Sequence, residues 1–232
     1  LEIYEEYTTS YPDDAFAQIN YAVLLSQAGQ QERSSELFNE LRQRGDYTFA
    51  EWNELGVGLL RVGAFAEAVL VFNRARQFDP LNKYVMANLV DAQVEARMYT
   101  EALPLADTLV KWYPYASAQY GPLANCLSRT GRAGDALTTL QVRESLPFVF
   151  DGVNLSRAGD VMYVVAGQVI GRGGLVGERV TIPFEFLGEN GDVVATRELE
   201  LLVPPADVGR AIRLELESET PIVGFRYSRV EN

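Results

Sequence analysis

The stretch AEWNELGVGLLRVGAFAEAVLVFNRARQFDP, residues 50–80, decides the fold of most of this chain. On either side of Gly63 its apolar residues recur at intervals of three and four, which is the spacing of one face of a helix. The pattern therefore predicts two helices, residues 50–62 and 66–78, which turn at Gly63 and pack on each other.

Small and large residues are combined on the facing sides of these two helices. Gly56 and Ala68 let the backbones approach closely, and Pro80 ends the second helix. The large side chains expected to fill the space around them are Trp52, Leu55 and Phe72. The stretch resembles a tetratricopeptide repeat, whose pattern W-x2-L-G…A-x3-F…P it matches at these positions. The resemblance implies a packing unit with no chemistry of its own.

A 34-residue period continues this unit in both directions. One step back gives Gln18, Tyr21, Ala22, Leu25 and Gly29, and steps forward give Met86, Leu89, Val90, Ala102, Ala106 and Leu109, then Tyr120, Leu123, Ala124, Leu127 and Gly131. Arg97 stands where a turn glycine is expected. We predict a helical array over residues 1–146, with a partial repeat at 1–14 and repeats at about 15–48, 49–82, 83–116 and 117–146.

After Pro147 the apolar period changes from 3.6 to 2, which indicates strands. The predicted strands are residues 148–155, 161–170, 178–187, 192–203, 210–218 and 221–230. Asn190-Gly191 predicts a two-residue hairpin with a type I′ turn. We therefore expect residues 148–232 to form a small antiparallel β-sandwich. The fold class is α+β, an α-solenoid of tetratricopeptide helix pairs followed by that sandwich.

The β region resembles, through VAGQV at 165–169, IPFEFLGENGDVV at 182–194 and IVGFRY at 222–227, the FxLYD-type and related immunoglobulin-like domains of bacterial surface and periplasmic proteins. The resemblance implies an extracytoplasmic, non-catalytic accessory module. The chain begins with Leu and no run of about 18 apolar residues occurs, so we expect a mature form or a piece that starts within the array, with no membrane span. The compartment stays open on the residues alone.

Composition argues against several functions. The net charge is −12 and Lys83 and Lys111 are the only lysines, which excludes a clustered basic surface for nucleic acid. Histidine is absent, so Ser-His-Asp, Cys-His and most zinc sites are excluded. The glycines of residues 171–177 lack phosphate-loop spacing, and Cys126 is expected to be a buried thiol. We predict no cofactor, no metal and no catalytic residue.

In tetratricopeptide arrays the first helices line a concave groove, and the resemblance carries this role onto one set of positions. The predicted protein-binding groove consists of Phe16, Ile19, Asn20, Val23, Asn53, Val57, Leu60, Arg61, Tyr84, Asn88, Asp91, Asn125 and Arg129. An apolar groove suits an amphipathic helix or an extended peptide of a protein partner. Packing of some of these residues between repeats or against the β domain is the alternative for individual positions, and a homo-oligomer is left open.

The resulting hypothesis is a non-enzymatic interaction scaffold with the β domain docked as a rigid accessory module. A second hypothesis makes the β-sandwich a ligand- or carbohydrate-binding module with the array as spacer, although Tyr163, Phe225 and Tyr227 are expected in its core. A third, an enzyme, requires a deep pocket with perturbed carboxylates. We further expect the β domain to dock on the last helix through Leu137, Leu140, Val142 and Leu146.

Overall fold

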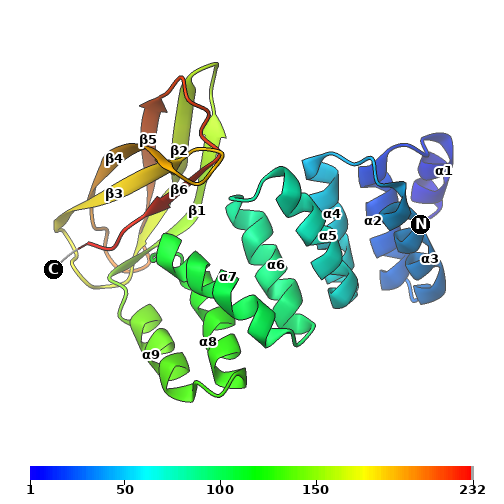
Figure 1. Cartoon of the computed structure of the whole chain (residues 1–232), viewed down its shortest axis with the longest axis horizontal. Helices are drawn as coiled ribbons and strands as arrows, with labels where there is room; N and C mark the ends of the chain where they lie inside the picture. The colour runs from blue at the N-terminus through cyan, green and yellow to red at the C-terminus, as the bar shows by residue number, and fades with distance from the viewer. Residues whose placement is uncertain (231–232) are drawn as a thin grey trace. The chain divides into compact units, whose positions relative to one another are not determined.

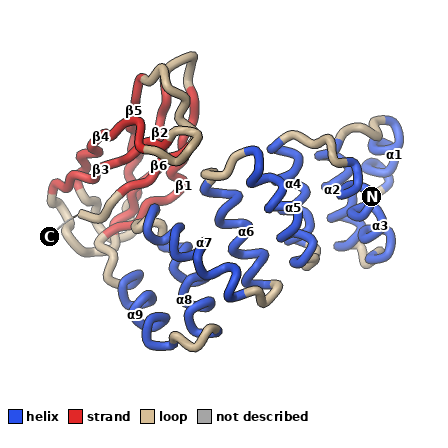
Figure 2. The backbone as a smooth tube through the Cα atoms, in the orientation of Figure 1, coloured by secondary structure: helices blue, strands red, loops and turns tan. Residues whose placement is uncertain are grey.

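The computed structural model describes residues 1–230 and divides into two compact units, Leu1–Met98 and Tyr99–Asn232. Helices occupy the chain as far as Glu144, and strands follow from Phe148 onward (Figures 1 and 2). The first unit is helical throughout, and the second combines helices with two antiparallel sheets. The α+β class predicted from the change of period is therefore confirmed.

The helices of the first unit are α1 (Glu2–Ser10), α2 (Ala15–Gln27), α3 (Gln31–Arg44), α4 (Phe49–Arg61), α5 (Phe65–Phe78) and α6 (Lys83–Glu95). Those of the second unit are α7 (Tyr99–Trp112), the short 3-10 helix η1 (Ser117–Gln119), α8 (Tyr120–Arg129) and α9 (Ala133–Glu144). First helices α2, α4 and α6 begin 34 residues apart, as do second helices α3, α5, α7 and α9. This spacing gives the chain a helical region of the tetratricopeptide type.

Capping residues start the first helices at the same interval. The side chain of Asp14 accepts a hydrogen bond from the Ala17 backbone N–H, Thr48 forms a capping box with Glu51, and Asn82 caps α6. Each cap satisfies a backbone donor that the helix itself leaves unpaired. Ala116 occupies the next position on this lattice and has no side chain that can cap. The fourth first helix accordingly begins as η1 before continuing as α8.

The close approach predicted for α4 and α5 is confirmed. A Cβ placed on Gly56 would lie 2.5 Å from the Phe72 ring, and Ala68 is fully buried. A Cβ on Gly58 would lie 2.8 Å from Ile19, so α2 and α4 are equally close at that point. Glycine at these two positions is thus a packing requirement and not a source of chain flexibility.

The turns between paired helices require a left-handed residue. Gly29, Gly63 and Gly131 have φ values of 80°, 78° and 84°. Arg97 occupies the same position with a φ of 62°, although its Cβ makes this conformation costly. The left-handed backbone conformation therefore recurs at this turn of each repeat, even where the sequence has no glycine.

The strands form two three-stranded antiparallel sheets, in the orders β1-β2-β5 and β4-β3-β6. Their bounds are β1 (Phe148–Arg157), β2 (Met162–Gly171), β3 (Arg179–Leu187), β4 (Val193–Leu202), β5 (Gly209–Glu217) and β6 (Gly224–Tyr227). The Phe150 and Phe184 rings contact each other between the sheets, with centroids 6.2 Å apart. Every predicted strand is present, and β6 is the one that is much shorter than predicted.

The hairpin at Asn190-Gly191 forms, but the predicted type I′ turn is wrong. Gly191 has a φ of 78°, whereas Asn190 is not among the residues with positive φ. The Gly191 N–H donates to the Gly188 carbonyl, and the Gly188 N–H donates to Asp192. This is a type I turn followed by a left-handed glycine, which allows a longer loop than the two residues predicted.

The predicted docking of the strands on the last helix is wrong in its location. Tyr113 and Tyr115, in the connection after α7, pack their rings against Phe225, Tyr227, Phe148 and Phe150. Leu137 of α9 remains 60% exposed, Leu140 and Val142 are half-buried, and only Leu146, just after α9, is buried; α9 also contributes a Glu144–Arg172 ion pair at its C-terminal end. The docking contact therefore lies in the α7–α8 connection, where aromatic side chains supply the apolar surface.

Candidate protein-binding surface

The candidate surface of the first unit lies on its first helices, α2, α4 and α6. The Asn88 side-chain N–H donates to the Asn53 side-chain oxygen over 3.4 Å, which joins α6 to α4 across this surface. We call the predicted groove positions on these three helices the first-helix face. Tyr84, Asn88 and Asp91 lie on one side of α6, because residues four and seven apart in a helix share a side. The first-helix face thus draws its residues from neighbouring helices of the first unit.

Two aromatic side chains of the first-helix face are accessible to solvent. Phe16 is 44% exposed and Tyr84 is 49% exposed. The Lys83 ammonium nitrogen lies 5.0 Å from the centre of the Tyr84 ring, within the range of a cation–π contact. Each ring therefore presents apolar surface beside polar groups, a combination common in residues that anchor protein partners.

Other predicted residues differ in accessibility. Ile19 and Val23 are buried, with 0% and 5% exposure, because the absence of a side chain on Gly58 brings α4 against α2. They have no free surface for a partner to contact in this arrangement. The half-buried members are Asn20, Asn53, Val57, Leu60 and Asn88.

Arg61 is exposed at the C-terminal end of α4 and forms an ion pair with Glu54, with 3.7 Å between the charged atoms. Glu54 lies seven residues before Arg61 and therefore on the same side of the helix. This spacing could have predicted the ion pair from the sequence, but the sequence analysis did not include it. Since both side chains are accessible to water, this ion pair adds little to stability and leaves Arg61 available to a partner.

The Asp91 carboxyl of the first-helix face has a raised pKa. Burial raises this pKa, and the charge of Glu95 one turn later raises it further. The carboxylate remains accessible to water, and within residues 1–230 it forms no hydrogen bond or ion pair. Surrounding protein thus removes part of its hydration without supplying a counter-charge. A cation from outside would be bound favourably here.

The two remaining predicted residues, Asn125 and Arg129, lie on α8 in the second unit. Both are exposed, and the Arg129 guanidinium lies 5.7 Å from the centre of the Tyr99 ring. Cys126, between them, is fully buried, and burial raises the pKa of its thiol. The prediction that this cysteine is an inert core residue agrees with that environment.

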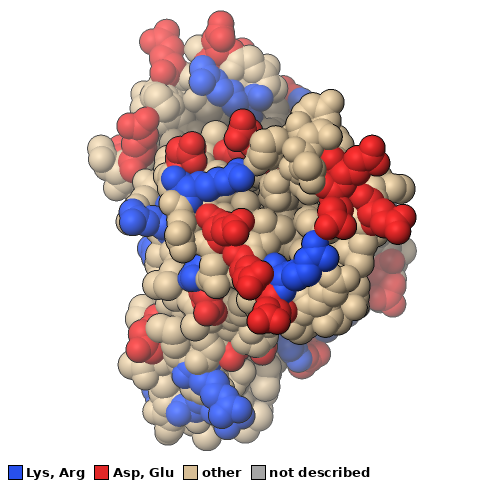
Figure 3. Space-filling view, turned by 90° about the vertical axis from the view of Figure 1, so that its right-hand side faces the viewer, with Lys and Arg blue, Asp and Glu red and all other residues tan. Residues whose placement is uncertain are grey.

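The surface offers little support for other kinds of site. Carboxylates and a smaller number of Lys and Arg side chains are interspersed on the face in Figure 3, and Arg33 pairs with Glu5 at 2.8 Å. Among residues 1–230 no three His, Cys, Asp or Glu side chains are grouped as metal ligands would be. The glycines of residues 171–177 connect β2 to β3, so they precede a strand and not a helix.

The β strands also lack exposed aromatic rings in their described part. Tyr163, Phe225 and Tyr227 are buried, with 3% to 4% exposure. The exposed large apolar side chains of residues 148–230 are aliphatic: Val161, Val176, Val193, Leu202 and Val208.

No helix within residues 1–230 is both long enough and apolar enough to cross a bilayer.

Comparison with known proteins gives structural likenesses and no sequence match. A scan against protein-family models finds none that matches, and a search of curated proteins finds no match either. Solved structures of MamA are similar over part of the chain. One MamA AMB-1 structure is 18% identical with a TM-score of 0.47, covering 57% of this chain and 78% of that one. MamA from Desulfovibrio magneticus RS-1 is 18% identical with a TM-score of 0.46, covering 56% and 74%.

Proposed function

We propose that this chain is a non-enzymatic protein-interaction module whose first helices bind a helix or extended segment of a partner protein. The observation that carries the proposal is Asp91, an accessible carboxylate with a raised pKa and no partner within residues 1–230. On the same side of α6 the exposed Tyr84 ring supplies an apolar anchor. A basic residue flanked by apolar residues would satisfy both features, so the partner segment is basic and amphipathic.

The remaining positions fit the same role. The Asn53–Asn88 pair keeps amide groups at the surface between α4 and α6, where they fix the register of a bound segment. Asn125 and Arg129, on α8 of the second unit, would take the same role there as separate contact residues. In this proposal the helical array over residues 1–146 is the binding domain, and the β-sandwich of residues 148–232 is a rigid accessory module held by the Tyr113–Tyr115 connection.

The test is affinity capture from the source organism with two pairs of variants. Tyr84→Ala removes the anchor, and Asp91→Arg reverses the charge that would attract a basic segment to the first-helix face. Each should weaken a specific partner by about 1 to 3 kcal/mol, roughly 5- to 150-fold. The matched controls, Leu70→Ala on α5 and Glu40→Arg on α3, change exposed side chains of the same kinds away from this face and should capture normally. Undiminished capture of every specific partner by the Tyr84→Ala, Asp91→Arg double variant would contradict the proposal.

A carbohydrate-binding role for the β-sandwich is the weaker of the two proposed functions. Glycan sites present aromatic rings to the sugar, whereas Tyr163, Phe225 and Tyr227 are all buried. A glycan array probed with the intact chain separates the two functions. Binding to a defined sugar that survives Tyr84→Ala would favour the carbohydrate role.

A further inference from the structure

The first half of β3 lacks a strand on one side. β4 pairs with β3 along its whole length, from Arg179 to Leu187. β6 pairs with β3 over Phe184–Leu187 alone. Within residues 1–230, the part of β3 before Pro183 therefore has an open edge on the side of β6. Open edges present unpaired backbone donors and acceptors to solvent.

The polar groups at this edge can be assigned from the neighbouring hydrogen bonds. The carbonyl of Pro183 accepts from the Ser228 N–H at 3.2 Å, and the carbonyl of Leu187 accepts from the Val223 N–H at 2.9 Å. Odd-numbered residues of β3 thus direct their backbone groups toward the β6 side. Because the direction alternates along a strand, the N–H and C=O of Thr181 and Arg179 also point to the open edge. Both residues are exposed.

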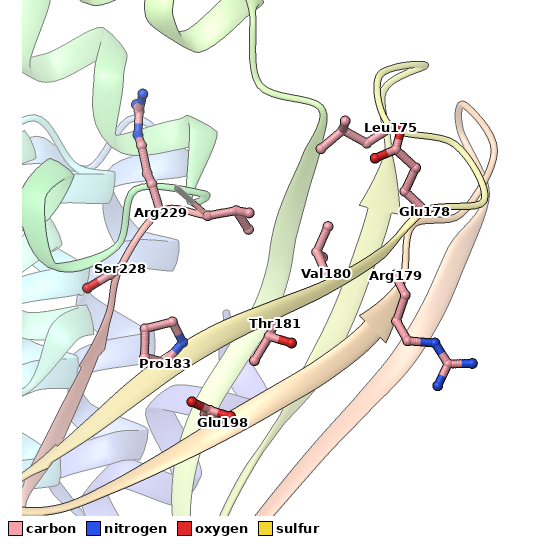
Figure 4. Close-up of a pocket in the computed structure, with 10 residues that line it drawn as sticks. Leu175, Glu178, Arg179, Val180, Thr181, Pro183, Glu198, Ser228 and Arg229 are labelled. Atoms are coloured by element: carbon pink, nitrogen blue, oxygen red, sulfur yellow. The ribbon is translucent and has the colours of Figure 1, made fainter. Parts of the chain in front are cut away.

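Two features keep β6 from covering this edge. Pro183 has no N–H to donate, so the ladder loses a hydrogen bond where β6 ends. Beyond Ser228 the chain is held by the aromatic connection after α7. Arg229 donates to the Tyr120 hydroxyl over 2.6 Å, and the Val230 N–H donates to the Tyr115 hydroxyl over 2.8 Å. The chain after β6 therefore diverges from β3 at the Pro183–Ser228 bond, as Figure 4 shows.

A pocket of about 660 Å3 lies at this divergence (Figure 4). Its apolar lining includes Leu175 and Val230, and its acidic lining consists of Glu178 and Glu198. Arg179 and Arg229 line it as well, and the guanidinium of Arg229 donates to the Tyr120 hydroxyl. The pocket is thus bounded by an open strand edge and is lined by two carboxylates that form no ion pair within residues 1–230.

We propose that an extended peptide segment carrying a basic side chain adds to β3 at Arg179 and Thr181 and occupies this pocket. Only another extended backbone complements a row of alternating N–H and C=O groups at strand spacing. The carboxylates of Glu178 and Glu198 select a Lys or Arg side chain, and Leu175 and Val230 receive an aliphatic one. The site is independent of the first-helix face and makes the β domain a second peptide-binding element.

The test uses the full chain and the synthetic peptide acetyl-Val-Lys-Val-Lys-Val-amide, with amide signals followed by NMR. Saturable shifts at Thr181 and Arg179 are expected, and exchange of the Thr181 N–H with solvent should slow by about tenfold or more on binding. The same peptide methylated on every backbone nitrogen, and the peptide with Glu in place of Lys, should both fail to bind. Equal binding of the methylated peptide would overturn strand addition, and equal binding of the Glu peptide would overturn the basic preference.

Two variants of one position provide a second readout. Thr181→Pro removes the edge N–H without touching the bonds to β4, whereas Thr181→Val keeps the N–H and the side-chain shape. Binding should be lost in the first variant and retained in the second. If Thr181→Pro does not fold, the methylated peptide decides the question. A Thr181 N–H that is already protected in the free chain, or becomes protected as protein concentration rises, would overturn the proposal because the chain itself or a second copy fills the edge.

Discussion

The side chain of Arg229 donates a hydrogen bond to the hydroxyl of Tyr120, 109 residues earlier in the chain, over 2.6 Å. The same hydroxyl donates to the carbonyl of Pro114, also over 2.6 Å. Burial raises the pKa of Tyr120, so the hydroxyl keeps the proton that it donates. One buried oxygen therefore links the end of α7, the start of α8 and the segment after β6, which makes the strands and these helices interdependent.

This linkage predicts that Tyr120→Phe lowers the free energy of unfolding by about 1 to 3 kcal/mol, because the buried Pro114 carbonyl is left without a donor. Arg229→Ala should cost less, since Arg229 is largely exposed. The double variant should cost less than the sum of the two, with a coupling of about 0.5 kcal/mol or more in urea unfolding. Tyr163→Phe, at another buried ring, is the control. If the losses in unfolding free energy of the two single variants add up to that of the double variant, the linkage between Arg229 and Tyr120 is contradicted.

The contact between Gly56 and Phe72 predicts opposite effects for two Gly→Ala changes. Gly56→Ala would place a methyl group 2.5 Å from the Phe72 ring and should destabilise the chain by about 1 to 3 kcal/mol. Gly121→Ala in α8 meets nothing within 4 Å and should stabilise by about 0.5 kcal/mol through helix propensity. Thermal unfolding of both variants measures the difference. A stabilising Gly56→Ala would show that the two helices are less closely packed than described.

The left-handed turn at Arg97 predicts a stabilising substitution. Arg97→Gly removes the crowding of a Cβ at a φ of 62° and should raise the free energy of unfolding by about 1 kcal/mol. Gly63→Ala, at the equivalent turn with a φ of 78°, should lower it by a similar amount. Chemical denaturation gives both values. An unchanged or lower stability for Arg97→Gly would mean that the arginine side chain contributes contacts that outweigh the strain.

The helical repeats could be predicted because small residues at Gly56 and Ala68, and the interval between them, are local properties of the sequence. The docking contact could not, since Tyr113 and Tyr115 follow a helix and no periodic pattern assigns a partner to residues in a connection. Asn190-Gly191 indicated a hairpin correctly, yet its turn type depends on the φ of Asn190, which the dipeptide alone does not fix. Similarly, the lattice assigned Ile19 to a helix, now α2, whereas its burial depends on Gly58 of the neighbouring helix, which the lattice does not take into account.

The raised pKa of Asp91 predicts a stability that depends on pH in a defined direction. Its folded-state pKa lies above the unfolded value, so between the two values the folded chain binds more protons than the unfolded chain. The free energy of unfolding therefore falls as pH rises through this window, and the loss reaches its full size above the folded-state pKa. Asp91→Asn should melt at a higher temperature than the natural chain at pH 7. The difference should vanish below about pH 4, near the ordinary pKa of aspartate.

Two further variants identify the cause. Asp13→Asn, on the exposed turn before α2, controls for the general loss of one negative charge. Glu95→Gln removes the smaller contribution to the Asp91 shift, so NMR titration of the Asp91 carboxyl should give a pKa that is lower than in the natural chain but still raised, because burial is the larger cause. If Glu95→Gln restores the ordinary pKa completely, repulsion from Glu95 and not burial raises it. In that case the carboxylate is well hydrated, and the reason for expecting a basic partner at Asp91 is lost.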